Sequence, residues 1–208
     1  MDLSMSDDLP VVYVVDDDPS VCTALERLFT SVRLGVELFD SAQEFLEHER
    51  ADAPGCLVLD VRLPGLSGLD LQAELAKTGG DLPIVFITGH GDIPMSVRAI
   101  KAGAVDFLPK PFKNQDLLDA VGKAIDQHRK TRSDHAERRK VQRRVEMLTD
   151  REREVLVLVV AGMMNKQIAG RLGVTVATVK THRGRAMQKM QVDSLAELVR
   201  MAERAGIS

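Results

Sequence analysis

The first 125 residues alternate short apolar runs with longer segments of helical pattern. The apolar runs are rich in β-branched residues, as in the run from Val11 to Val15 and the run from Ile84 to Ile87. Short runs of this kind between helical segments predict parallel strands joined by crossover helices. We therefore expect an α/β layered fold, with strands at 11–16, 35–39, 56–60, 83–88 and 105–109. The helices expected between and after them occupy 20–31, 42–49, 69–77, 94–102 and 114–128.

Polar side chains stand at the ends of four of these strands. Asp16 and Asp17 close the first strand, Asp60 the third, Thr88 the fourth, and Lys110 follows the fifth. In an open parallel sheet the functional site lies at the carboxyl ends of the strands, so these groups are expected to meet. One such residue alone would be an ordinary cap or a solvated side chain. Four consistent strand ends favour a carboxylate that accepts a phosphoryl group.

A carboxylate acceptor is itself an anion, so the incoming phosphoryl oxygens need cations beside them. Asp17 and Asp60 can hold a magnesium ion, with Asp16 acting directly or through water, because Mg²⁺ binds few carboxylates and keeps several waters. Lys110 supplies a compact positive charge for a phosphoryl oxygen. The Thr88 hydroxyl can donate to another oxygen once the phosphate is in place.

The sequence changes character at residue 126. Residues 126–146 hold 8 Lys/Arg and 4 Asp/Glu without Gly or Pro, which predicts a charged, solvated helical linker into which the fifth helix can continue. The pattern beyond it is all-helical, with helices expected at 150–161, 165–172, 176–190 and 195–204. Gly173 lies in the turn between the second and third of these, which favours a helix-turn-helix. Thr149 with Glu152 predicts a capping box at the start of the first.

The charge balance also divides the chain. Residues 1–125 carry 10 Lys/Arg against 21 Asp/Glu, a balance of −11, whereas 126–146 and 147–208 each carry +4. This split indicates two domains with different partners. A basic helix face is usually only solvated, but within a helix-turn-helix it favours double-stranded DNA. The acidic N-terminus is unlike a signal peptide and no apolar run reaches the roughly 18 residues of a membrane span, so a cytoplasmic protein is expected.

The third C-terminal helix is the expected DNA-reading element, with Thr175 as its cap. Helical spacing directs one set of side chains to the core: Val176, Val179, Met187 and Met190. The set expected to face outward is Lys180, Thr181, Arg183, Gly184 and Arg185. Two histidines attract attention without supporting a catalytic role: His90 is expected in a loop or at the surface, and His128 to be solvated in its charged segment.

The strand-end motifs resemble those of response-regulator receiver domains. They read Val14-Val15-Asp16-Asp17, Leu59-Asp60-Val-Arg-Leu-Pro-Gly-Leu-Ser-Gly, Ile87-Thr88-Gly and Lys110-Pro-Phe. The run from Thr88 to Phe112 resembles the FixJ branch of the NarL/FixJ family. The resemblance implies a flavodoxin-like sheet of five parallel strands and a cis peptide between Lys110 and Pro111. It also implies specific roles: Asp60 as phosphoacceptor with Thr88 and Lys110 assisting, Mg²⁺ held by Asp16, Asp17, Asp60 and the backbone carbonyl of Arg62, and a switch pair of Thr88 and Phe107.

The C-terminal segments resemble the LuxR-type four-helix effector. They begin at Leu148-Thr-Asp-Arg-Glu, Asn165-Lys-Gln-Ile-Ala and Thr178-Val-Lys-Thr-His-Arg. By residue match, Lys180, Thr181 and Arg185 are expected at base edges, and Lys166, Arg183 and Lys189 at phosphates. Gly184 departs from the pattern, because some relatives carry a basic residue there. The resemblance implies a sensor histidine kinase, double-stranded DNA and RNA polymerase as partners, and a homodimer formed on phosphorylation or on DNA.

The sequence is thus interpreted as a two-component response regulator that controls transcription. Its parts would be a receiver domain at 1–125, a helical linker at 126–146 and a LuxR-type helix-turn-helix domain at 147–208. A phosphatase with the same aspartyl chemistry is the rival from another class, but Asp60-Val-Arg lacks the second acid of an Asp-x-Asp motif. We therefore expect no enzyme activity beyond self-directed phosphoryl transfer and autodephosphorylation. A vestigial receiver is argued against by the complete strand-end set, and a phosphate sink or scaffold by the helix-turn-helix.

Overall fold

The computed structural model of the chain describes residues 9–89, 93–204 and 207. It divides into two compact units, Met1–Arg132 and Ser133–Ser208, here called the N-terminal unit and the C-terminal unit. His90, which was expected in a loop, lies outside the described residues. Among the described helices none is long and apolar enough to cross a membrane.

The N-terminal unit is built on one sheet of five parallel strands, in the order β2-β1-β3-β4-β5. This is the flavodoxin-like order, so the expected fold is confirmed. Each predicted strand is present, with ends that differ by at most one residue. The strands are β1 (Val11–Val15), β2 (Gly35–Phe39), β3 (Gly55–Asp60), β4 (Ile84–Thr88) and β5 (Asp106–Pro109).

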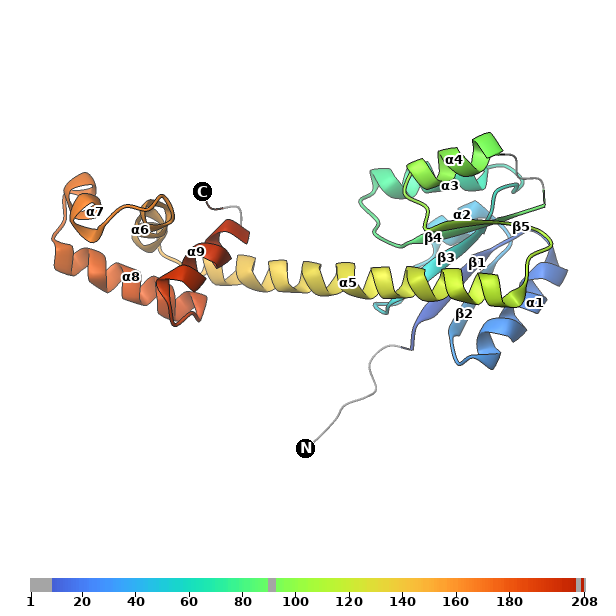
Figure 1. The fold of residues 1–208 in the computed structure, drawn as a ribbon, viewed down its shortest axis with the longest axis horizontal. Helices are drawn as coiled ribbons and strands as arrows, with labels where there is room; N and C mark the ends of the chain where they lie inside the picture. The colour runs from blue at the N-terminus through green and yellow to red at the C-terminus, as the bar shows by residue number, and fades with distance from the viewer. Residues whose placement is uncertain (1–8, 90–92, 205–206, 208) are drawn as a thin grey trace, which may run out of the picture. The chain divides into compact units, whose positions relative to one another are not determined.

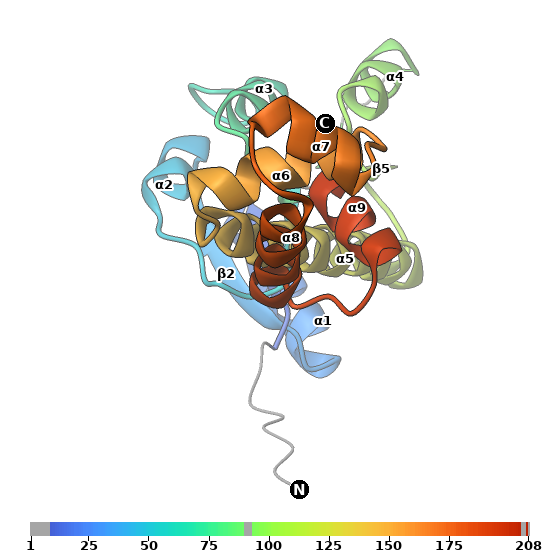
Figure 2. The same cartoon turned by 90° about the vertical axis from the view of Figure 1, so that its left-hand side faces the viewer.

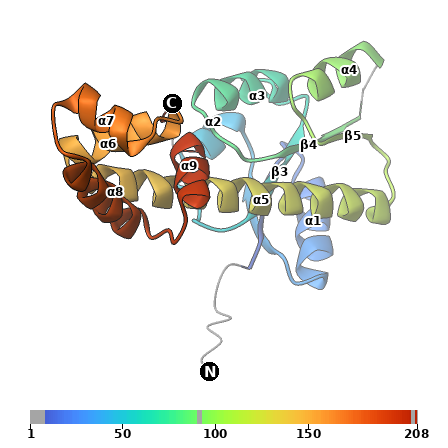
Figure 3. The same cartoon turned by 60° about the vertical axis from the view of Figure 1, so that its left-hand side comes forward.

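Helices cover both faces of this sheet (Figures 1 and 3). They are α1 (Pro19–Ser31), α2 (Ala42–Glu47), α3 (Gly68–Lys77), α4 (Ile93–Lys101) and α5 (Asn114–Glu146). Phe29 of α1 and Leu117 of α5 belong to the core on one face, and Phe45 of α2 and Leu71 of α3 to the core on the other. Because both faces are covered, every residue of the central strand β3 is buried.

The C-terminal unit is a helical domain around a core of its own. Its helices are α6 (Asp150–Val160), α7 (Asn165–Leu172), α8 (Val176–Met190) and α9 (Leu195–Arg204), and Figure 2 shows α6, α7 and α9 around α8. The Thr149–Glu152 capping box is present as predicted. Gly173 ends α7 with a left-handed φ of 66°, which glycine adopts without steric cost and which makes the turn into α8.

Helix α5 continues into the predicted helical linker. It runs without a break from Asn114 to Glu146, past the expected end at 128, which the absence of Gly and Pro from 126–146 allowed. The difference from the prediction is that the end of this segment is not solvated. Val141 and Val145 are 3% and 2% exposed and belong to the core of the C-terminal unit. The last turns of this charged segment are therefore part of a folded core, because two valines four residues apart form an apolar stripe on an otherwise polar helix.

Two single residues also differ from expectation. His128 is only 6% exposed instead of solvated, because its Nδ1 accepts the backbone N–H of Gly55 at 2.9 Å. Val176 is 39% exposed instead of core-facing. It is the first residue of α8, directly after the Thr175 cap, and the first fully buried residue of this helix is Val179.

Candidate phosphoryl site and nucleic-acid interface

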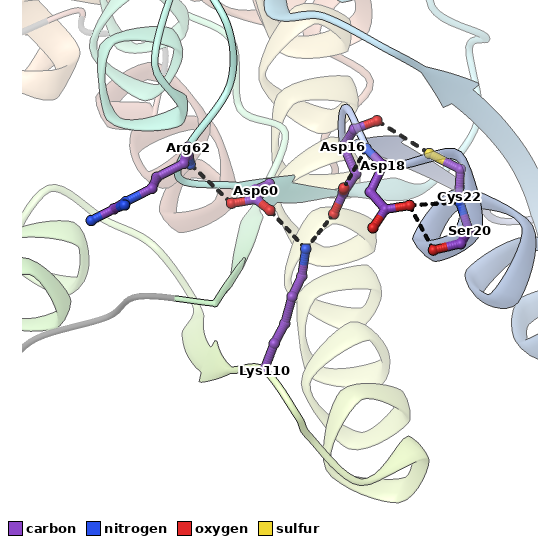
Figure 4. Close-up of polar contacts among 7 residues, drawn as sticks. All are labelled: Asp16, Asp18, Ser20, Cys22, Asp60, Arg62 and Lys110. Atoms are coloured by element: carbon purple, nitrogen blue, oxygen red, sulfur yellow. Dashed lines mark hydrogen bonds and ion pairs between the residues drawn. The ribbon is translucent and has the colours of Figure 1, made fainter.

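The strand-end residues of the N-terminal unit meet around one ammonium group (Figure 4). Lys110 directs its Nζ to Asp16 Oδ2 at 2.6 Å and to Asp60 Oδ2 at 2.7 Å. Asp16 directly follows β1, Asp60 ends β3 and Lys110 directly follows β5. The parallel sheet therefore brings together side chains that are 44 to 94 residues apart in sequence.

A third carboxylate completes the group. Asp16, Asp17 and Asp60 offer oxygen atoms that all lie within 4.8 Å of one another. Asp16 and Asp60 are buried, whereas Asp17 is exposed, so the cluster opens to solvent on one side. Three hard oxygen donors with one open side suit Mg²⁺, which keeps part of its water shell. The residues present therefore fit the ion that their chemistry implies.

Burial and ion pairing oppose each other in this cluster. Burial raises the pKa of Asp16 above its ordinary value, and the hydrogen bonds from Lys110 and from the Asp18 backbone only partly offset this effect. Burial by itself would lower the pKa of Lys110, but the bonds to Asp16 and Asp60 outweigh it and raise that pKa. The lysine consequently stays charged, and its charge offsets part of the cost of burying the Asp16 carboxylate.

The backbone around Asp60 is fixed from two directions. The N–H of Arg62 donates to Asp60 Oδ1 at 2.9 Å, and Arg62 itself is exposed. Gly68, at the start of α3, lies so close that a Cβ there would be 2.2 Å from the Asp60 carbonyl oxygen. Only glycine permits this approach, so Gly68 is part of the site's support. Gly68 is part of the sequence motif that follows Asp60. The neighbouring residues do not show that its Cα packs against the Asp60 backbone.

Asp18 and Cys22 lie beside the cluster and support the local backbone, whereas Asp16 and Asp17 are candidate metal ligands. Asp18 is the N-cap of α1 and accepts from the Ser20 N–H at 2.8 Å, so the third aspartate of the run is a capping residue. The Cys22 thiol donates to the Asp16 carbonyl at 3.3 Å. Both contacts hold the segment that follows β1 (Figure 4).

Thr88 and Phe107 lie on adjacent strands. Thr88 is the last residue of β4 and is fully buried. Phe107 of β5 pairs in register with Phe86, whose ring centroid is 6.1 Å away, and it is only partly buried. Since side chains alternate along a strand, Thr88 and Phe86 share one face of β4.

The peptide between Lys110 and Pro111 is cis, as predicted.

In the C-terminal unit, α8 presents most of its predicted DNA-contacting residues to solvent. Thr175 caps the helix by accepting the Thr178 N–H at 3.1 Å. Lys180, Thr181 and Arg185 on α8 are exposed, as is Lys166 on α7. Gly184 is also exposed, and a Cβ added there would meet no atom within 4 Å beyond its own stretch of helix, so the helix surface has room for a side chain at this position.

Two predicted phosphate contacts have partners within the unit. Lys189 directs its Nζ to Glu152 Oε2 at 2.6 Å, and its side chain is 33% exposed. Burial raises the pKa of Glu152, but the bonds from Lys189 and from Thr149 prevail and keep it below the ordinary value. Arg183 makes a long 3.4 Å bond to Asn165 of α7. These cations help to fix α8 against α6 and α7. The sequence did not reveal these partners, because its spacing shows which face a residue occupies and not what it meets.

Comparison with known proteins assigns a family to each of the two units. Residues 12–122 match the family described as response regulator receiver domain, and residues 146–202 match bacterial regulatory proteins of the luxR family. Nodulation protein W of Bradyrhizobium diazoefficiens is 54% identical over 95% of this chain and 87% of its own length. Response regulator protein TodT of Pseudomonas putida is 48% identical over 96% of this chain and 88% of its own.

Solved structures extend the likeness to the fold. The response regulator StyR superposes with a TM-score of 0.85 at 51% identity, covering 94% of this chain and 98% of that one. Full-length FixJ from B. japonicum superposes with a TM-score of 0.57 at 41% identity, covering 95% and 98%. The chain therefore belongs to the bacterial response regulators that combine a receiver domain with a luxR-family DNA-binding domain.

Proposed function

We propose that this protein is a phosphorylation-dependent transcription regulator in which Asp60 accepts a phosphoryl group from a sensor histidine kinase. The observation that carries the proposal is the cluster of Asp16, Asp17 and Asp60, with the Lys110 ammonium bonded to the first and last of them. A partly buried ammonium between two carboxylates at strand ends is not needed to hold the sheet, since hydrogen bonds and two apolar cores already do so. It is suited to a transferred phosphoryl group.

The transfer is a displacement at phosphorus. A carboxylate oxygen of Asp60 forms the new O–P bond as the P–N bond to the kinase histidine breaks, and the departing imidazole nitrogen keeps the electron pair. Asp16, Asp17 and Asp60, with the Arg62 carbonyl, would hold Mg²⁺, which neutralises charge on the phosphoryl oxygens when bound. Lys110 is near enough to Asp60 to neutralise a further oxygen.

Phosphorylation adds a charge of about −1.5 to −2 at neutral pH, which can bias a nearby two-state element. Thr88 and Phe107 form that element: the hydroxyl turns toward the phosphate, and the partly buried ring turns further inward. The face around α4 and β5 then favours a homodimer. Three large apolar side chains on α4, Ile93, Val97 and Ile100, are exposed and give such a face something to bury.

The DNA-binding part of the proposal uses α8. Lys180, Thr181 and Arg185 read base edges in the major groove, and Lys166, Arg183 and Lys189 meet phosphates. The exposure of Lys166, Lys180, Thr181 and Arg185 leaves these four side chains accessible to DNA. Lys189 would have to share its charge between Glu152 and the DNA. The dimer binds paired half-sites and recruits RNA polymerase, which implies a cytoplasmic location.

Turnover of external phosphoesters is not part of the proposed function. Two residues after Asp60 stands the exposed cation Arg62, where an Asp-x-Asp phosphatase would have its general acid. The chemistry is then limited to phosphorylation of Asp60 and slow hydrolysis of the product.

The test uses the full chain with acetyl phosphate and Mg²⁺. Intact-mass spectrometry measures phosphoryl uptake, and light scattering measures the oligomeric state. We expect uptake and dimer formation in the wild type and in the control Glu26→Gln, which removes an exposed carboxylate on α1, and neither in Asp60→Asn. Uptake by Asp60→Asn would refute the site assignment, and no uptake by the wild type would favour a vestigial receiver.

A further inference from the structure

The C-terminal end of α8 is held by a side chain from a different helix. Arg144, in the last turn of α5, donates from Nη1 to the Met190 carbonyl at 3.1 Å and from Nη2 to Gln191 Oε1 at 2.5 Å. Met190 is the last residue of α8 and Gln191 is its C-cap. The final carbonyls of a helix lack intrahelical partners and carry partial negative charge, so a guanidinium is a well-matched donor for them.

The cap itself is unusual because it is not glycine. Gln191 has a left-handed φ of 55°, a conformation that is sterically unfavourable for an L side chain. The Val192 N–H bonds the Met187 carbonyl at 3.1 Å, and Val192 is buried, so the chain does turn there as in a glycine-capped helix. The bond from Arg144 to the Gln191 side chain helps to hold this strained cap in place.

Arg144 is itself firmly anchored. Val141 and Val145, on the same helix, are buried in the core of the C-terminal unit. On another side of the same α8 turn, Lys189 is bonded to the buried carboxylate of Glu152. The last turn of α8 is therefore fixed by α5 and by α6, and Lys180, which is proposed to read bases, lies further along the same helix with its side chain exposed.

Resting on the DNA-binding function proposed above, we propose that Arg144 is a positioning residue for DNA recognition. Through its bonds to the end of α8 it sets the direction in which that helix presents Lys180 and Thr181, and it does not touch DNA. At about 1.5 Å rise per residue, Lys180 lies roughly 15 Å from Met190 along the helix, so a tilt of about 5° at Met190 moves it by roughly 1 Å. A shift of that size takes a hydrogen bond to a base edge outside its usual distance range.

A direct phosphate contact is the competing explanation for Arg144. It lines a hollow together with Arg139, Lys140, Arg143 and Gln191, and this basic surface could attract DNA by charge alone. Arg143 provides a matched control, because it is the neighbouring residue, carries the same charge, is exposed and lines the same hollow. Unlike Arg144, it has no hydrogen bond to α8 among those found in the described residues.

The experiment uses the full chain and two probes: a duplex selected by the wild type from a random-sequence library, and an unrelated duplex of equal length. Binding is measured over a series of salt concentrations, and the melting of the C-terminal unit is followed in parallel. We expect Arg144→Gln to weaken binding to the selected duplex on the order of tenfold, with little change for the unrelated duplex and no change in the salt slope. Arg143→Gln should leave the ratio of the two affinities near the wild-type value, and Arg144→Lys should restore part of it.

The variant Gln191→Gly tests whether a loss of selectivity could result from unfolding of the C-terminal unit. Glycine relieves the left-handed cap but removes the acceptor of one Arg144 bond, so melting should not fall while selectivity still decreases. The inference is overturned if neither Arg144→Gln nor Gln191→Gly lowers selectivity, or if Arg143→Gln and Arg144→Gln act alike. A loss of about 0.9 in the salt slope with Arg144→Gln would also overturn it, by showing a phosphate contact. Failure of the wild type to select any duplex would overturn the DNA-binding function itself.

Discussion

Lys110 is the one residue on which the charge balance of the acidic cluster depends. Its ammonium lies between Asp16 and Asp60, two buried carboxylates that would repel each other without it. The sequence predicted all three because each one ends a strand or directly follows one, a position readable from local pattern. What it could not supply was their pairing, since the Lys110 bonds join residues 50 and 94 positions apart.

Replacing Lys110 with Met should have opposite effects on metal binding and on phosphorylation. Removal of the competing cation should tighten Mg²⁺ binding on the order of tenfold, as expected for the loss of one charge a few ångströms from the site. Phosphoryl uptake from acetyl phosphate should be lost, because an oxygen of the incoming group loses its partner. Calorimetric titration with Mg²⁺ measures the first effect, with the exposed Lys113→Met as the control. Weaker or unchanged Mg²⁺ binding would show that the ammonium and the ion do not compete.

His128 is a residue whose burial the sequence did not predict. Its charged surroundings in the sequence indicated a solvated side chain, yet its ring is buried and accepts the N–H of Gly55, 73 residues away. Its Nε2 lies 3.7 Å from Asp81, and Arg132, the other charge near the ring, bonds Asp52. No local pattern reports such a contact, because it arises only when the sheet has formed.

His128 should also make the stability of the N-terminal unit depend on pH. Burial lowers the pKa of His128 below 6.5, with Asp81 opposing the effect. The unfolded chain therefore takes up the proton first, and stability present above about pH 6.5 is lost as the pH falls, by at most about 1.4 kcal/mol per pH unit. His128→Asn keeps an acceptor for Gly55 and does not titrate. Urea unfolding between pH 7.5 and 5.5 should show a smaller loss for this variant than for the wild type or for the exposed His135→Asn. Equal losses in all three would rule His128 out as the source.

At the scale of helices and strands, local sequence signals were sufficient to predict the type and the order of the elements. Every predicted strand and helix is present, because short β-branched runs, caps such as Thr149 and turn glycines such as Gly173 act within a few residues. The exceptions lie at element ends. Helix α5 continues to Glu146 because nothing in residues 126–146 breaks a helix. Val141 and Val145 mark an apolar stripe near its end, but their spacing alone does not show which core they join.

Gly184 is expected to lower the stability of α8, and this expectation can be tested. It lies inside α8, is exposed, and has open space where a Cβ would be. Gly184→Ala should therefore stabilise the C-terminal unit by about 1 kcal/mol, since alanine loses less backbone entropy in a helix. Gly173→Ala is the contrasting control: its φ of 66° should make the same change destabilising. Both are measured by urea unfolding. Destabilisation by Gly184→Ala would indicate a constraint on α8 that its surroundings do not reveal.

At the scale of the whole molecule, packing and family likeness divide the chain at different places. The family matches cover residues 12–122 and 146–202, which leaves most of α5 between them. Packing instead divides the chain after Arg132, so that residues 133–146 belong to the C-terminal unit. The reason is visible in two side chains, Val141 and Val145, which fill part of the C-terminal core although they precede the luxR-family match.

A fragment that begins at residue 133 should therefore be clearly more stable than one that begins at 147. Full burial of a valine contributes about 1.5–3 kcal/mol, so loss of Val141 and Val145 should cost roughly 3–6 kcal/mol. Domains of this kind have total stabilities of about 5–15 kcal/mol, which would leave the shorter fragment marginal or unfolded. Urea unfolding of both fragments measures the difference, and the double variant Val141→Ala, Val145→Ala in the longer fragment shows whether these two side chains account for it. Equal stability of the two fragments would mean that the last turns of α5 cover the C-terminal core without contributing to it, and that the luxR-family match alone marks the folded domain.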